Sequence, residues 1–85
     1  MKNKELLDTR RVNGWNFQLV DVNITFYECR GGMFYDDDHD ETPEPSLWLA
    51  AMQLENDLLS EGYIAEANHS EKGWVEVTIE DNNKL

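Results

Sequence analysis

This 85-residue chain has 18 acidic and 7 basic side chains, a formal net charge of −11 and 40% hydrophobic residues, which predicts one small globular domain. Its charge argues against direct binding to nucleic acid or to anionic membranes, because both rely on basic side chains. No stretch approaches the roughly 18 apolar residues of a membrane span, and no secretory signal is visible, so we expect a cytoplasmic protein.

The acidity is unevenly distributed along the chain. Residues 1–30 contain five basic and four acidic side chains, whereas residues 31–85 contain two basic and 14 acidic side chains. The lone Cys29 fits a reducing compartment, and we expect it to be a buried strand residue.

The first predicted element is a β-hairpin. Residues 1–4 are expected to be a loose tail, and residues 5–12 are compatible with either a strand or a short helix. Asn13-Gly14 favours the strand, because a type I′ turn needs positive φ at both of its central positions.

Residues 15–29 alternate like strands but change parity. Val22, Ile24 and Phe26 share one side, whereas Phe17 and Leu19 upstream have the opposite parity. This pattern predicts either one long strand bent near residues 20–21 or two separate strands.

A second tight turn is predicted at Gly31-Gly32, with a short return strand at residues 33–35. Residues 36–45 then contain six acidic side chains and two prolines. This composition is typical of a solvated connection.

Residues 45–62 give the clearest helical pattern. Pro43 and Pro45 suit the start of a helix, Gly62 suits its end, and Thr42 and Ser46 are both candidate N-caps. One apolar stripe has helical spacing and is expected to face the core: Leu47, Ala51, Leu54 and Leu58.

A second apolar strip on this helix contains Trp48, Met52 and Leu59. It is interpreted either as the margin of a wide buried face or as a surface for self-association or a partner.

Residues 63–68 and 74–80 are predicted strands joined by a loop, and residues 81–85 are expected to be a tail. In the second strand Val75, Val77 and Ile79 should face the core, opposite Glu76, Thr78 and Glu80. The order β-β-(β)-α-β-β predicts one α+β domain over residues 1–85: a small two-layer domain with an antiparallel sheet of four to five strands and one amphipathic helix on one face.

The acidic run has part of the pattern of a metal-binding loop. Asp36, Asp38 and Asp40 have the 1-3-5 spacing of a calcium loop, but Glu41 replaces the required Gly and Leu47 replaces the final Glu. Residues Cys29, His39 and His69 lack zinc-site spacing. We therefore expect no metal site and no cofactor.

Catalysis is not expected either. Gly31-Gly32 lacks the Lys-Ser/Thr of a phosphate-binding loop. A chain of this length also leaves little room for an active-site cleft once its core is built.

The sequence favours a non-enzymatic acidic module that binds a basic surface of another protein. In size and composition it is similar to small phage-encoded inhibitors that occupy a nucleic-acid-binding surface. The predicted partner-binding residues are Tyr35, Asp36, Asp37, Asp38, Asp40, Glu41, Glu44 and Trp48. One alternative is a homodimer formed through Trp48, Met52 and Leu59, with acidity serving only solubility. Another is a weak divalent-ion binder that uses residues 36–41.

Overall fold

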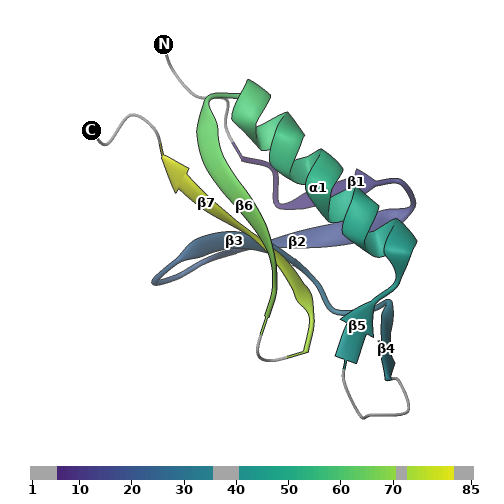
Figure 1. Ribbon diagram of the computed structural model, residues 1–85. Coiled ribbons are helices and arrows are strands. Elements are labelled where there is room, and N and C mark those ends of the chain that lie inside the picture. The colour runs from purple at the N-terminus through teal and green to yellow at the C-terminus, as the bar shows by residue number, and fades with distance from the viewer. Residues whose placement is uncertain (1–5, 36–40, 71–72, 82–85) are drawn as a thin grey trace.

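The computed structural model describes residues 6–35, 41–70 and 73–81, in which one helix packs on one face of an antiparallel sheet (Figure 1). The five strands of this sheet lie in the order β1-β2-β3-β7-β6. Their bounds are β1 Thr9–Val12, β2 Trp15–Asp21, β3 Thr25–Cys29, β6 Tyr63–His69 and β7 Val75–Asp81. The predicted α+β two-layer fold is confirmed. The predicted tail at residues 1–4 lies outside the described residues, as does the predicted tail at residues 81–85 apart from Asp81, which is the last residue of β7 and not part of a tail.

The first hairpin forms where Asn13-Gly14 predicted it. Asn13 has φ of 51° and Gly14 has φ of 87°, as a type I′ turn requires, and Val12 pairs with Trp15 across the turn. Residues 9–12 are therefore a strand, which resolves the ambiguity left by the sequence.

β2 and β3 are two separate strands, which is one of the two arrangements that the sequence left open. Val22 and Ile24 lie in the intervening turn and are 77% and 60% exposed. Leu19 pairs with Tyr27, and paired residues of antiparallel strands share a face. Tyr27 is consequently fully buried in the core, whereas Phe26 lies on the open face of the sheet.

The predicted hairpin at Gly31-Gly32 was also wrong. The short strand β4 (Met33–Tyr35) exists, but it pairs with β5 (Glu41–Pro43) in a separate two-stranded sheet. The reason is that β3 already pairs with β2 on one edge and β7 on the other, so it has no free edge for a returning strand. Residues 41–43 thus form a strand within the predicted solvated connection.

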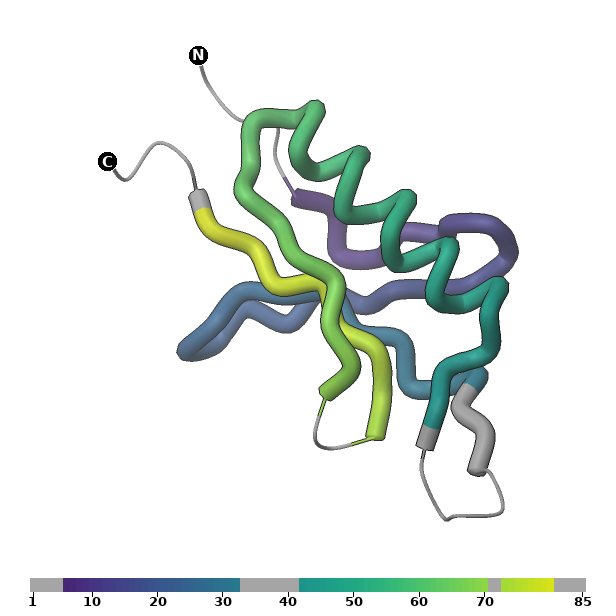
Figure 2. Tube along the Cα trace, in the orientation of Figure 1, coloured from purple at the N-terminus to yellow at the C-terminus, as the bar shows by residue number. Residues whose placement is uncertain are grey.

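Helix α1 (Pro45–Ser60) follows β5 after one residue, and Figure 2 shows the chain passing from β5 directly into its first turn. Its N-cap is Glu44, which makes no side-chain capping bond. Thr42 and Ser46 were therefore wrong as N-caps, because Thr42 belongs to β5 and Ser46 lies inside the helix. The helix ends two residues before Gly62, which has φ of 100°.

The core lies between α1 and the sheet. The predicted helix stripe is confirmed, since its four members and Ala50 are all fully buried. The sheet contributes Phe17, Tyr27, Cys29, Val75, Val77 and Ile79. The inward positions predicted for β7 and for Cys29 are therefore correct.

Candidate protein-binding surface

An open apolar groove of about 460 Å³ lies where β5, α1 and β6 meet. It is lined by Pro43 at the end of β5, Pro45 and Trp48 in the first turn of α1, and His69 at the end of β6. The groove therefore joins two consecutive elements, β5 and α1, to the distant end of β6.

The start of α1 is held in place by hydrogen bonds from two directions. The Glu44 amide donates to the Gly32 carbonyl at 2.7 Å, which ties the helix entry to the segment after β3. The Trp15 indole Nε1 donates to Ser46 Oγ at 3.2 Å, and Ser46 Oγ donates to the Glu44 carboxylate at 2.9 Å. These bonds fix the wall of the groove that Pro45 and Trp48 form.

The second apolar strip of the helix is divided by the fold. Trp48 is half-buried at the margin of the core and lines the groove, whereas Met52 and Leu59 are 44% and 46% exposed. Glu55 lies between them, and its Oε1 accepts the amide of Ala67 in β6 at 2.9 Å. The wide-buried-face interpretation therefore describes Trp48 in part and does not describe Met52 or Leu59.

The predicted acidic residues fall partly within the described structure. Tyr35 and Glu41 are paired across the β4–β5 ladder, and Glu44 is half-buried between the two groove prolines. The remaining four, Asp36, Asp37, Asp38 and Asp40, lie outside the described residues. β5, which begins directly after this acidic run, ends in the groove residue Pro43.

The described residues contain twelve acidic side chains and three arginines, Arg10, Arg11 and Arg30. Arg10 makes a two-pronged salt bridge with Glu61, at 2.6 and 2.7 Å, and this carboxylate raises the pKa of Arg10. Arg30 donates to Glu28 at 3.0 Å. Two of these three cations are thus bound to carboxylates of the same chain.

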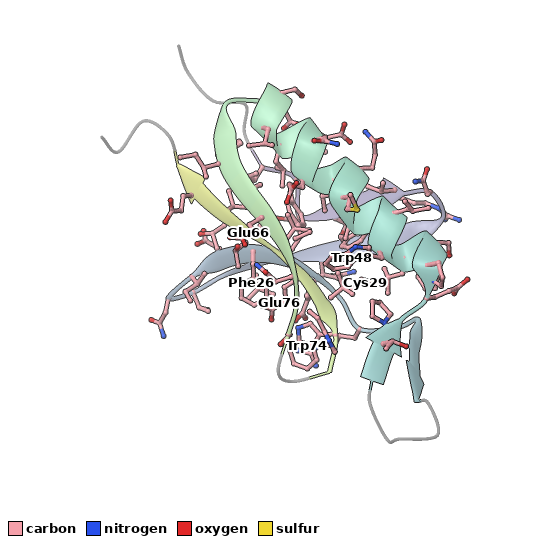
Figure 3. All side chains as sticks on the ribbon, viewed as in Figure 1. Phe26, Cys29, Trp48, Glu66, Trp74 and Glu76 are labelled. Carbon is pink, nitrogen blue, oxygen red and sulfur yellow. The ribbon has the colours of Figure 1, made fainter. Side chains whose placement is uncertain are left out.

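The open face of the sheet carries a second polar and aromatic cluster, which the sequence-based search for a site missed (Figure 3). The Arg30 guanidinium lies 4.2 Å from the ring centroid of Trp74, and the Trp74 indole donates to Glu76 at 2.9 Å. Glu28 and Glu76 are direct cross-strand partners. The alternation of residues 74–80 was the available signal, because it places Trp74 on the same side as Glu76.

Burial of the thiol and clustering of ligands decide whether the described side chains could form a reactive thiol or a metal site. Cys29 is buried, and burial raises the pKa of its thiol, which lowers the fraction of reactive thiolate. Within residues 6–35, 41–70 and 73–81, no three His, Cys, Asp or Glu side chains gather as a metal site would need. Nor does this part of the chain contain a helix with the length and apolarity to cross a membrane.

No protein-family model, curated protein or solved structure matches this chain.

Proposed function

We propose that this protein is a non-enzymatic module that binds a basic surface of another protein. The observation that carries the proposal is the excess of acid left after internal pairing. The described residues include twelve acidic side chains and only three arginines. Two of those arginines are already bound to Glu61 and Glu28. Such an excess steers association with a positively charged partner.

The start of α1 is the part of the molecule best suited to this contact. The acidic run of residues 36–40 precedes β5 in the sequence, Glu41 is the first residue of β5, and the groove adjoins the end of that strand. Acidic side chains would provide attraction, and Trp48 would provide the aromatic contact area that binding energy at interfaces often depends on. A partner whose basic surface normally binds nucleic acid would be blocked by this protein, which would make the module an inhibitor.

Affinity capture with the full chain tests the proposal. Proteins captured at low salt should be enriched in basic and nucleic-acid-binding proteins, and added heparin should release them, because it competes for the same cations. Changing Asp36, Asp37, Asp38 and Asp40 to Asn should reduce this capture by about tenfold.

The matched control removes the same number of charges elsewhere, through Asp8→Asn, Asp21→Asn, Asp57→Asn and Glu80→Gln. It should retain most of the capture. A captured set with no basic enrichment, or equal losses in both variants, would contradict the proposal.

Self-association is a second candidate function, supported by the exposure of Met52 and Leu59 on one side of α1. A dimer through this side should dissociate in a Met52→Lys/Leu59→Lys variant. Light scattering that shows a monomer for the unmodified chain at high micromolar concentration would remove this candidate.

A further inference from the structure

The open groove between β5, α1 and β6 is a suitable binding surface for one apolar side chain. The described residues that line it, Pro43, Pro45, Trp48 and His69, present mainly apolar surface, and the groove is open to solvent with a volume of about 460 Å³. Trp48 is half-buried, so its ring is held by the core margin on one side while another part lines the groove.

The groove is also preorganised. Pro45 has a restricted backbone at the first helical position, and the Glu44–Gly32 and Trp15–Ser46 hydrogen bonds hold the helix entry. A surface that is already ordered loses little conformational freedom when a ligand binds, which favours affinity.

Charge decides which kind of apolar ligand fits. The described residues that line the groove include no Lys or Arg, and the whole chain has a net charge of −11. Glu44 stands between the two lining prolines. An apolar side chain flanked by acids would be repelled from this region, whereas one flanked by Lys or Arg would be attracted.

We infer that the groove binds a single aromatic or long aliphatic side chain presented by a Lys/Arg-rich segment of the partner protein. This inference rests on the proposed function and adds the part of the partner that gives specificity. The basic residues of the partner increase the association rate, and the apolar side chain lowers the dissociation rate of the complex.

Three synthetic peptides separate the contributions: acetyl-KKWKK-amide, acetyl-KKAKK-amide and acetyl-EEWEE-amide. Each is titrated into the ¹⁵N-labelled full chain at about 20 mM NaCl, where charge attraction is weakly screened. KKWKK should bind at least about tenfold more tightly than KKAKK, as burial of an aromatic side chain predicts. Its shifts should centre on the Trp48 indole and the amide of His69.

A pair of variants with the same net charge provides the control. His69→Lys places a cation on the groove and should abolish the preference for KKWKK over KKAKK. Asn68→Lys makes the same charge change on the opposite face of β6 and should preserve that preference. Trp48→Ala and Met52→Ala form a second pair: the first variant should lose the preference for KKWKK over KKAKK, and the second should keep it. Each variant's amide spectrum shows whether its fold is intact.

Every outcome bears on the inference. Equal binding of KKWKK and KKAKK would overturn the groove as an anchor site and leave charge-driven docking intact. Equal binding of EEWEE and KKWKK would overturn the requirement for a basic segment and count against the proposed function. Failure of all three peptides to bind would overturn both.

Discussion

Gly32 and Gly14 have similar backbone conformations but very different surroundings. Their φ angles are +72° and +87°, so an alanine is strained at either position. A Cβ at Gly14 would meet nothing within 4 Å, whereas a Cβ at Gly32 would lie 2.7 Å from the Trp15 ring and 2.9 Å from Leu47. We predict that Gly14→Ala costs about 1 kcal/mol of unfolding free energy and Gly32→Ala about 2–4 kcal/mol.

Urea denaturation of the two variants measures the difference directly. Equal losses would mean that the packing around Gly32 relaxes freely, and the close approach of Trp15 and Leu47 would then carry no energy. Because the Gly32 carbonyl also accepts the Glu44 amide, Gly32→Ala should in addition shift the NMR signal of the Trp48 indole.

Arg10 links three elements through its guanidinium. It donates to the Glu61 carboxylate at the end of α1 and, through Nε, to the Tyr27 hydroxyl in β3 at 3.2 Å. The Arg10 and Glu61 side chains are only 12% and 14% exposed, so removal of one partner leaves a poorly hydrated charge. We predict that Arg10→Ala costs about 2–3 kcal/mol of unfolding free energy.

Arg11→Ala is the matched control, because Arg11 is the exposed neighbour on the other face of β1. It should change stability by less than about 0.5 kcal/mol. Arg10→Lys should fall between the two, since lysine cannot reproduce the two-pronged contact. A similar loss for Arg10→Ala and Arg11→Ala would show that the salt bridge adds nothing to their common charge effect.

At the scale of elements, α1 packs on the core and also binds the edge strand β6. Its residue Glu55 accepts a hydrogen bond from the Ala67 amide of that strand. An open edge amide can pair with a strand of another molecule. Glu55→Ala should therefore lower the unfolding free energy by about 1–2 kcal/mol and increase concentration-dependent association.

Analytical ultracentrifugation and urea denaturation together test this role of Glu55. Glu55→Gln retains an acceptor oxygen and should remain monomeric if the unmodified chain is monomeric, as should Asn56→Ala at the exposed neighbouring position. Unchanged association of Glu55→Ala would show that another feature protects the β6 edge.

At the scale of the whole molecule, a net charge of −11 implies repulsion within the folded chain. Raising NaCl from about 10 to about 500 mM screens this repulsion and should raise the Tm by about 3–8 °C, which corresponds to ~0.5–1 kcal/mol in a domain of this size. Calorimetric scans at several salt concentrations measure the change. A falling Tm would mean that ion pairs such as Arg10–Glu61 outweigh the repulsion.

The same scans with MgCl₂ and CaCl₂ at matched ionic strength address the divalent-ion alternative. Screening alone predicts the same Tm in all three salts. A higher Tm with either divalent ion, lost when Asp36, Asp38 and Asp40 are changed to Asn, would favour a metal-binding site.

The candidate site was only partly predictable from the sequence. Trp48 stands out as an aromatic residue beside an acidic run, but Pro43 and Pro45 indicate only the start of a helix, and nothing in the sequence places His69 beside them. Their meeting in one groove depends on how β6 returns beneath the start of α1. Periodicity within a segment contains no information on that contact.

The sequence by itself determined the elements whose side chains repeat with a regular period. The Leu47–Leu58 stripe, the Asn13-Gly14 turn and the alternation of β7 each reflect a local geometric rule, so each was predicted correctly. Only the tertiary structure decided which strand pairs with β4, that the Tyr27 side chain is buried, and that a groove forms at Trp48. These depend on which strand edges and faces are already occupied, and that is a property of the assembled sheet.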